Sequence, residues 1–286
     1  MKTAHHITEF LAPKYGKGEA QAMMRILMEK ICSLSFTDIL MDRDDNIGDK
    51  ERIMLDKAVE RLIGGEPLQY IIGETDFCGL TVKVAPGVLI PRPETEELVK
   101  LVTHGIMQTM TQAHTRQPLS ILDICTGSGC IALALKNRFP DSKVEGWDIS
   151  DEALNIAMEN SHRLDLGVEF KHMDILNCSI PTDKFSIIVS NPPYVCDSEK
   201  KNMEENVLMN EPHLALFVSD DDPLVFYRAI TNAATSMLKD GGRVYFEINR
   251  RFGAEVREIA EEAGFHDVEI TEDLFGNPRF VSGAWK

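Results

Sequence analysis

Apolar residues in the first part of the chain recur at the spacing of amphipathic helices. Two such runs, separated by the polar stretch 42–48, contain Ala20, Met23, Met24, Leu27 and Ile31, and then Ile53, Leu55, Val59 and Leu62. Residues at this spacing share one face of a helix, so each run predicts a helix with a buried side. We therefore expect a small helical bundle over residues 1–72. Because it is appended to a longer region of different pattern, we interpret it as a substrate-docking domain.

Strand patterns begin after this bundle. Short alternating runs around Gly79 predict a β-hairpin, and we assign residues 73–92 to a linker. From 93 to 286 the two patterns alternate, with strands expected at 119–124, 143–148, 168–172, 185–190 and 242–249 and helices at 94–113, 130–138, 151–164, 223–238 and 253–263. Such alternation is typical of an α/β domain with a doubly wound, mostly parallel sheet. The last runs, 266–272 and 279–285, predict an antiparallel terminal hairpin.

Composition limits the classes of function. At 286 residues, of which 43% are hydrophobic, the chain is long enough for two domains with their own cores. Its 30 basic and 46 acidic residues give a net charge of −16 with no basic cluster, so we expect no direct binding of nucleic acid. The 6 cysteines lack Cys-x-x-Cys spacing and the 8 histidines form no His-Glu-x-x-His signature, so no metal is expected.

The cysteines and the N-terminus also bear on location. Unpaired cysteines are typical of reducing compartments, and we expect a cytoplasmic protein. Met1 leads into no long apolar stretch, so neither a signal peptide nor a membrane span is expected. We expect the protein to act as a monomer.

The most informative motif is Asn191-Pro192-Pro193-Tyr194, which directly follows the apolar run 185–190. A buried parallel strand has such a run, and α/β sheets bind ligands beyond the carboxyl ends of their strands. Asn191 offers a side-chain carbonyl, and the prolines stiffen a loop whose carbonyls stay free to accept hydrogen bonds. Two fixed acceptors suit a planar –NH₂ group, whose nitrogen lone pair they localise, and Tyr194 adds an aromatic face. A turn without chemistry is the alternative, which the motif's position disfavours.

A second motif lies between an apolar strand and a helical pattern, where glycines let the backbone approach a ligand closely. Its loop residues are Cys125, Thr126, Gly127, Ser128 and Gly129. Asp148 ends the next strand pattern, about twenty residues further on, where an acid hydrogen-bonds ribose hydroxyls. Asp174 and Ile175 follow the strand pattern after that. Together these residues predict a nucleoside site.

Two cofactors compete for this site. NAD stays possible because Ala132, where its fingerprint has a third glycine, is a conservative replacement. A pyrophosphate, however, needs a free helix N-terminus, and the carboxylate of Asp123 beside the loop suits a cationic ligand better. The spacing Asp123-x-x-x-Gly127-x-Gly129 resembles the S-adenosylmethionine motif of class I methyltransferases, in which a carboxylate faces the methionine end of the cofactor.

Several segments occur in the order seen in the HemK/PrmC-type N(5)-glutamine methyltransferases, which modify peptide chain release factors. They are residues 90–98, 123–129, 191–195, 211–216 and 226–230, and the resemblance extends from residue 61 to residue 279. It implies a seven-stranded class I methyltransferase sheet, S-adenosylmethionine as cofactor, and the glutamine of a Gly-Gly-Gln motif in a release factor as methyl acceptor. The Asn-Pro-Pro-Tyr motif alone is shared with adenine-N6 DNA methyltransferases, whereas we do not associate the Pro-Arg-Pro-Glu-Thr-Glu segment with them.

The resemblance also implies roles for the motif residues. Asn191, Pro192 and Tyr194 would be catalytic and, with Pro193, would bind the glutamine amide. The cofactor would be bound by Asp123, Cys125, Thr126, Gly127, Ser128, Gly129, Asp148, Asp174, Ile175 and Asn191.

The chain departs from the family pattern at two positions. Cys125 replaces the first glycine of the loop, and because cysteine readily adopts negative φ we expect a local change alone. Asn249 replaces a glycine after the strand that ends near Glu247, where asparagine tolerates left-handed backbone better than most residues. Glu247 is either functional or a solvated strand end, and Glu211 either shapes a lid or ends a loop.

The segment Arg92-Pro93-Glu94-Thr95-Glu96 suits the start of a helix, with proline near its first position and acids in its first turn. Whether it also contributes to the active site is left open by the sequence.

Three functions remain. A protein glutamine methyltransferase is the leading one. An adenine-N6 nucleic-acid methyltransferase would flip its base into the same site, and the acidic charge weighs against it. A non-catalytic assembly factor could retain the fold, but intact Asp123, Asp148 and Asn191 weigh against that.

Overall fold

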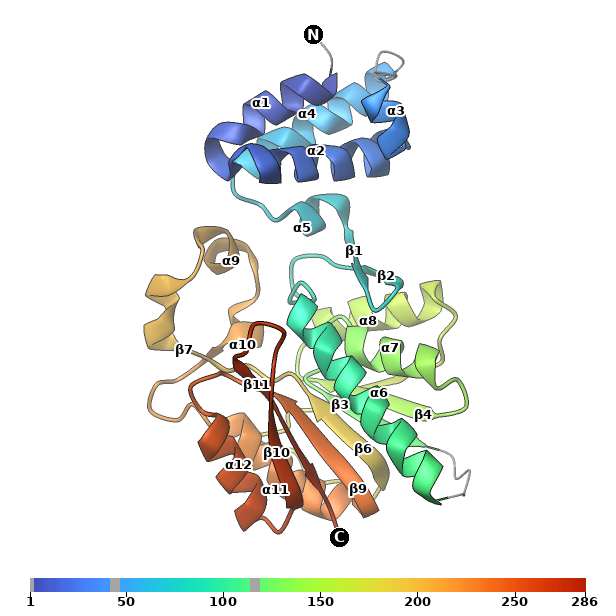
Figure 1. The fold of residues 1–286 in the computed structure, drawn as a ribbon, viewed down its shortest axis with the longest axis vertical. Coiled ribbons are helices and arrows are strands. Elements are labelled where there is room, and N and C mark those ends of the chain that lie inside the picture. Colours follow the sequence, from blue (N-terminus) through green and yellow to red (C-terminus); the bar gives the residue numbers. More distant parts are fainter. Residues whose placement is uncertain (1–2, 42–46, 114–118) are drawn as a thin grey trace. The chain divides into compact units, whose positions relative to one another are not determined.

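The computed structural model describes residues 3–41, 47–113 and 119–286 (Figure 1). The chain divides into two units, the first comprising Met1–Glu74 with Glu204–Asn210 and the second Thr75–Met203 with Glu211–Lys286. Across the described ranges, no helix has both the length and the apolar character needed to cross a membrane.

The first unit contains the helical bundle that the sequence predicts. Its helices are α1 (Thr3–Tyr15), α2 (Lys17–Cys32), α3 (Phe36–Leu40), α4 (Asp49–Ile63) and α5 (Leu68–Ile72). Leu11, Met28 and Leu62 are fully buried in its core, so this methionine is a core residue. A short helix from much later in the chain, α9 (Glu205–Asn210), joins this unit, where the Asn210 side chain donates to the Gly65 carbonyl at 3.0 Å. The sequence patterns did not predict that addition.

The second unit is built on a 7-stranded sheet with strand order β10-β11-β9-β6-β3-β4-β5. The strands are β3 (Ser120–Ile124), β4 (Lys143–Asp148), β5 (Glu169–His172), β6 (Phe185–Ser190), β9 (Leu238–Glu247), β10 (His266–Glu272) and β11 (Pro278–Ala284). All neighbours from β9 to β5 are parallel, whereas β11 is antiparallel to both β9 and β10. The predicted doubly wound sheet with a terminal hairpin is confirmed, although β9 begins and ends earlier than the predicted 242–249.

Two small sheets accompany the large one. The predicted hairpin forms from β1 (Glu74–Phe77) and β2 (Leu80–Lys83), and a parallel pair forms from β7 (Val195–Cys196) and β8 (Phe217–Val218). Between β7 and β8 the chain forms the 3₁₀ helix η2 (Asp197–Asn202), α9 and α10 (His213–Leu216). The segment that follows the Asn-Pro-Pro-Tyr loop therefore leaves the strand pair and returns to it at β8.

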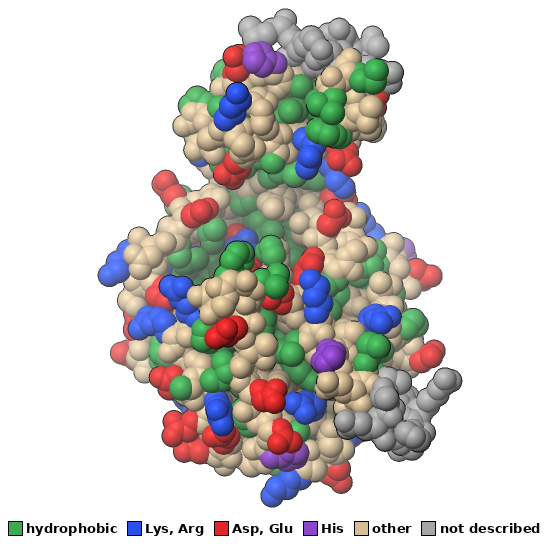
Figure 2. Space-filling view, in the orientation of Figure 1, with side chains coloured by type: hydrophobic (Ala, Val, Ile, Leu, Met, Phe, Trp, Pro, Cys, Tyr) green, Lys and Arg blue, Asp and Glu red, His purple; other side chains and the backbone are tan. Residues whose placement is uncertain are grey.

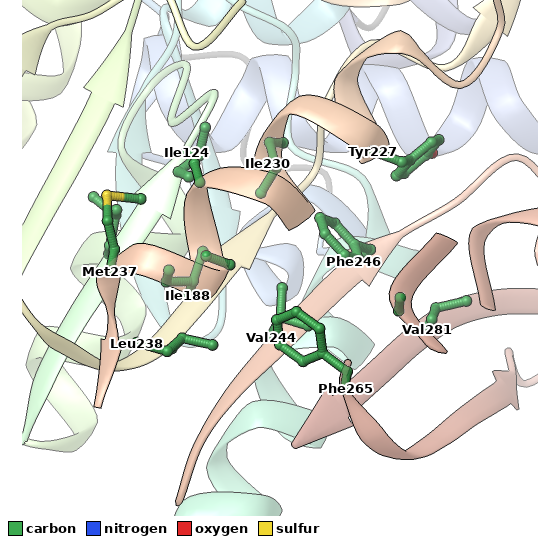
Figure 3. Close-up of a cluster of buried hydrophobic side chains, with 14 of the residues drawn as sticks. Ile124, Ile188, Tyr227, Ile230, Met237, Leu238, Val244, Phe246, Phe265 and Val281 are labelled. Carbon is green, nitrogen blue, oxygen red and sulfur yellow. The ribbon is translucent and has the colours of Figure 1, made fainter. Parts of the chain in front are cut away.

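Helices cover both faces of the large sheet (Figure 1). They are α6 (Pro93–Ala113), α7 (Cys130–Arg138), α8 (Asp151–Arg163), α11 (Val225–Met237) and α12 (Gly253–Glu262). Because side chains alternate along a strand, Ile187 and Val189 of β6 pack with α6 and α7, while Ile188 packs with α11 and α12. Figure 3 shows the hydrophobic cluster between β6 and helices α11 and α12, in which Ile188 lies with Ile230 and Val244. Both cores hold the carboxyl ends of the central strands in place.

Candidate active site

A thiol, two carboxyl groups and an amide lie at the carboxyl ends of four neighbouring parallel strands. The end of β3 pairs with the ends of β4 and β6, and the end of β6 pairs with that of β9. The residues that end or directly follow these strands are Cys125, Asp148, Asn191 and Glu247. They therefore lie along one edge of the sheet, the edge at which doubly wound folds bind ligands.

A cavity of about 360 Å³ opens at this edge, a volume suited to a small ligand. The predicted site residues that line it are Cys125, Gly127, Asp148, Asp174, Ile175, Asn191 and Pro193. The other predicted site residues are absent from its described lining, although they lie in neighbouring positions: Asp123, Thr126, Ser128, Gly129, Pro192 and Tyr194.

Sequence reasoning missed part of the lining. Residues 87–89, 149, 150, 152 and 153 and Phe226 contribute to it, and 212–215 line the cavity in addition to ending a loop. Their positions in the sequence could have indicated this role, because 87–89 directly precede the motif segment 90–98 and Phe226 begins the motif segment 226–230. Apolar side chains such as Val88 and Phe226 provide walls for a flat, weakly polar ligand group.

The glycine loop, residues 125–129, corrects the expectation for Cys125. The φ of Cys125 is 60°, in the left-handed region, whereas a negative φ was expected. Bonds on its C-terminal side impose this path, because the Thr126 N–H donates to the Trp147 carbonyl at 2.9 Å and the Gly127 N–H to Asp148 Oδ2 at 2.8 Å. Cys125 thus follows the backbone path of a glycine and adds a thiol to the cavity wall. Burial raises the pKa of that thiol, so it stays uncharged.

The two glycines of the loop serve different purposes. Gly127 lines the cavity at a φ of 55°, and a Cβ there would meet no atom within 4 Å. Gly129 has a φ of 79°, and its Cβ would lie 3.0 Å from the Phe170 ring and 3.1 Å from the Ala157 side chain. Gly127 therefore keeps space open beside a ligand, whereas Gly129 lets the loop pack against its neighbours.

Backbone N–H groups hold two of the acids that line the cavity, Asp148 and Asp174. Asp148 accepts from the Ser150 N–H at 2.9 Å and from the Gly127 N–H at 2.8 Å. Asp174 accepts from the Leu176 N–H at 3.0 Å. Burial raises the pKa of Asp148, and the N–H bonds oppose that rise. Since each carboxylate oxygen has two lone pairs, both acids keep acceptor capacity for ligand hydroxyl or amino groups.

Asp123 lies in β3 and is fully buried. Its Oδ2 accepts from the Thr126 hydroxyl at 2.6 Å and from the Ala132 N–H at 3.2 Å, while no described residue donates to Oδ1. Burial raises the pKa of Asp123 to about 7, although both hydrogen bonds lower it. A buried carboxylate oxygen without a donor, beside the glycine loop, fits a ligand that brings a cationic nitrogen.

A chain of buried groups orients the Asn191 amide. Its Nδ2 donates to Thr95 Oγ1 at 3.1 Å, and the Thr95 hydroxyl donates to Glu247 Oε2 at 2.8 Å. Because Thr95 uses its single proton on Glu247, it can only accept from Asn191. Nδ2 of Asn191 is therefore directed to Thr95, which leaves Oδ1 for the cavity. Thr95 and Glu247, whose roles the sequence left open, are thus bonded to the cavity residue Asn191, Thr95 directly and Glu247 through Thr95.

Tyr194 is held through both its side chain and its backbone. Its hydroxyl donates to Glu247 Oε1 at 3.0 Å, and its carbonyl accepts from Asn249 Nδ2 at 3.1 Å. Burial raises the pKa of both Tyr194 and Glu247. Asn249 does not have positive φ, so the glycine that it replaces is not needed for a left-handed turn. Asn249 instead anchors the Asn-Pro-Pro-Tyr loop.

Glu211 joins two walls of the cavity. Its carboxylate accepts from Arg92 Nη2 at 2.6 Å and from the Ile90 N–H at 3.1 Å, and the residue is 4% exposed. These bonds tie the segment before α6 to the segment that enters α10. Helix α6 begins at Pro93, one residue before the predicted start at 94, and Arg92 directly before it bonds Glu211 beside the cavity.

Comparisons with known proteins cover almost the whole chain. The family described as PrmC N-terminal domain matches residues 4–73, and Methyltransferase small domain matches residues 100–216. A release factor glutamine methyltransferase of Bacteroides thetaiotaomicron is 41% identical over 278 residues, which are 97% of each chain. One of Flavobacterium psychrophilum is 40% identical over 95% of this chain and 94% of its own.

A solved structure agrees with the fold of the second unit. A 16S rRNA N2 G1207 methyltransferase of T. thermophilus, in complex with AdoMet and guanosine, has a TM-score of 0.51 at 16% identity. The match covers 74% of this chain and 50% of that protein. At this identity the likeness concerns the fold alone.

Proposed function

The chain belongs to the release factor glutamine methyltransferase family, and from this premise we propose that it methylates the side-chain amide nitrogen of a glutamine in peptide chain release factors. The methyl donor is S-adenosylmethionine, and the acceptor is the glutamine of the Gly-Gly-Gln motif. The observation that carries the proposal is the bond from Asn191 Nδ2 to Thr95, which leaves the side-chain oxygen of this cavity-lining residue available as an acceptor.

Residues of the cavity fit this donor. Asp148 would accept from its ribose hydroxyls, and Asp174 with Ile175 would contact the edge of its adenine. Oδ1 of Asp123, which lies beside the glycine loop and outside the cavity lining, would receive its ammonium group. Gly127 would let the ligand approach the backbone, because a Cβ there would otherwise enter the open space. When bound, S-adenosylmethionine supplies a methyl group on a positively charged sulfur.

The Asn-Pro-Pro-Tyr loop would bind the glutamine amide. Asn191 Oδ1 and the Pro192 carbonyl accept the two amide N–H groups, and the Tyr194 ring, anchored through Glu247, packs on the amide plane. Both acceptors would localise the lone pair of the nitrogen, which would form the new N–C bond as the methyl–sulfur bond of the donor breaks and S-adenosylhomocysteine leaves. As positive charge develops on nitrogen, these fixed dipoles stabilise it more than they stabilise the ground state. Water accepts the proton that is lost afterwards.

Thr95 and Glu247 act as positioning residues in this scheme. They touch neither the donor nor the amide, but they hold the Asn191 side chain in one of its two amide orientations. Orientation matters because well-positioned reactants gain roughly 7–11 kcal/mol over free reactants. The main task of this chain is thus to align the glutamine amide with the methyl group of the donor, which the positively charged sulfur already activates.

The remaining expectations concern partners. We propose a cytoplasmic monomer that contacts neither nucleic acid nor membrane directly. On the face that Figure 2 shows, Lys and Arg side chains are interspersed with Asp and Glu, which agrees with a net charge of −16. We also propose that the helical domain, residues 1–72, docks the release factor, because a glutamine amide presents too little surface to select one protein.

A labelled methyl-donor assay tests the function. Release factor, DNA and RNA are offered separately to the enzyme, and mass spectrometry then locates the methyl group. We expect label in the release factor at the Gly-Gly-Gln glutamine, and none after Gln→Ala substitution there. Label in adenine would refute the proposal in favour of a nucleic-acid methyltransferase.

A further inference from the structure

The turn that joins β10 to β11, residues 273–277, exposes two adjacent apolar side chains. Leu274 is 85% exposed and Phe275 is 81% exposed, more than any other large hydrophobic side chain among the described residues. Tight turns normally carry small or polar residues at their tips. A single exposed leucine would need no explanation, but a neighbouring leucine and phenylalanine together point to a binding surface.

Hydrogen bonds within the turn make its backbone rigid, so Leu274 and Phe275 project from a fixed position. The buried carboxylate of Asp273 accepts from the backbone N–H groups of Phe275 and Asn277, each at 2.9 Å, and from Arg279 Nε at 3.2 Å. Gly276 has a φ of 77°, which closes the turn. Binding through a preformed turn loses less conformational entropy than binding through a mobile one.

A further bond fixes the turn to the start of α6. The Leu274 N–H donates to Glu97 Oε2 at 3.1 Å, two residues after Thr95. The turn is therefore tied to the same helical turn that orients Asn191.

The turn also lies at the edge of the sheet that carries the site. Phe280 of β11 pairs with Glu247 of β9, and the Ile248 N–H donates to the Arg279 carbonyl at 2.9 Å. Because β11 is antiparallel to β9, the residues just before β11 lie beyond the carboxyl end of β9. In Figure 1 the β10–β11 turn lies at the same end of the sheet as α10. Arg279, which bonds Asp273, also interacts electrostatically with Tyr194 and Glu247.

We propose that Leu274 and Phe275 form a contact surface for the protein substrate, which binds them with an apolar patch beside its glutamine loop. The inference rests on the function proposed above. Continuity with the Asn191 site favours the substrate as occupant, because a protein whose glutamine enters the cavity must cover its rim. Two side chains are too few for a stable dimer, which needs roughly 800 Å² per partner.

The charges around the turn refine the partner's chemistry. Two acidic residues flank the turn at its surface: Glu272 is exposed, and Glu97, whose carboxylate accepts from the Leu274 N–H, is partly exposed. The adjacent Asp273 is buried and bonded to Arg279. Acidic flanks disfavour an anionic membrane or nucleic acid. They favour a protein patch flanked by Lys or Arg, which would also steer the encounter.

The test compares wild type with the double variant Leu274→Ser/Phe275→Ser. We expect kcat/KM on intact release factor to fall about ten- to a hundredfold, mainly through KM, as for truncation of central contact residues. A short Gly-Gly-Gln peptide should be methylated at the wild-type rate, and calorimetry should give unchanged S-adenosylmethionine affinity. Met158→Ser, at a 48% exposed methionine of α8 that does not line the cavity, is the matched control and should change none of these values.

A photo-reactive phenylalanine analogue at position 275 gives an independent readout. It should crosslink to the release factor and not to a second copy of the enzyme. Equal kcat/KM on intact release factor for wild type and the double variant would overturn the inference, as would self-crosslinking or a matching loss on the peptide. If wild type methylates no release factor at all, the proposed function itself fails, which is a distinct result.

Discussion

Replacing Thr95 by valine tests the proposed orientation of Asn191. The substitution nearly preserves side-chain shape and removes the hydroxyl, which donates to Glu247 at 2.8 Å and accepts from Asn191 at 3.1 Å. Thr95 is 3% exposed, so solvent does not readily replace the lost contacts. The Asn191 amide then loses the acceptor that distinguishes its nitrogen from its oxygen.

The expected magnitude follows from these two bonds. A neutral hydrogen bond contributes about 0.5–1.5 kcal/mol and one to a charged group about 1.5–3 kcal/mol. Glu247 keeps its bond from Tyr194, and Asn191 borders the cavity, so we expect a loss of about 1–3 kcal/mol in the free energy of unfolding. Partial loss of one transition-state acceptor should lower kcat about ten- to thirtyfold, or about 1.4–2 kcal/mol.

The assay measures kcat on release factor at saturating donor, and calorimetry measures donor affinity, which should stay unchanged. Thr95→Ser should restore kcat because it restores the hydroxyl. Thr109→Val is the matched control, since this exposed threonine on the same helix bonds the Gly105 carbonyl of its own helix at 3.0 Å. A Thr95→Val enzyme with lowered stability but wild-type kcat would show that the chain of bonds only supports the fold.

Three further outcomes are expected. Burial raises the pKa of Asp123 to about 7 from 3.8, so between these pH values the folded protein without donor holds a proton that the unfolded chain has lost. The stability that this proton contributes is fully present below pH 3.8 and is lost as pH rises through 7. Donor binding should therefore release a proton and strengthen from about pH 5.5 to 7, and calorimetry in two buffers should find both effects absent in Asp123→Asn. Gly129→Ala should lower the free energy of unfolding by about 1–3 kcal/mol in denaturant titration, because φ is 79° and the new Cβ lies 3.0 Å from Phe170, whereas Gly167→Ala, with open space, should not. A chain beginning at Gly73 should still bind donor and methylate a peptide, but lose most of its advantage on intact release factor; equal efficiency would remove the docking role from residues 1–72.

Local patterns predict the fold well where a strand is buried on both faces. The run 185–190 is apolar except for Ser186 and Ser190, and β6 has the predicted bounds, Phe185–Ser190. The start of β9 was missed because Lys239, Asp240 and Gly241 do not have a strand pattern, yet Leu238 pairs with Phe185 across an irregular register. A pairing partner, rather than local composition, sets that boundary.

Motifs locate the site but not its backbone detail. The glycine loop and the Asn-Pro-Pro-Tyr loop lie where the strand pattern predicts, because each directly follows a recognisable strand. The conformation of Cys125 was predicted wrongly, since its φ of 60° accompanies a hydrogen bond from Thr126 to Trp147 of the neighbouring strand. Preferences of a residue type do not include such constraints.

The orientation of Asn191 depends on residues that no local pattern connects. Thr95 lies 96 positions before Asn191 and 152 before Glu247, and the three meet because β6 and β9 are neighbours and α6 packs across them. The start of α6 is tied in turn to the β10–β11 turn through Glu97, and to α10 through Arg92 and Glu211. Contacts with residues around the cavity are therefore connected to the Asn191 amide through the start of α6. Because Asn191 is held through Thr95, a change that shifts the start of α6 should lower kcat before it weakens donor binding, which depends on β3, β4 and the glycine loop.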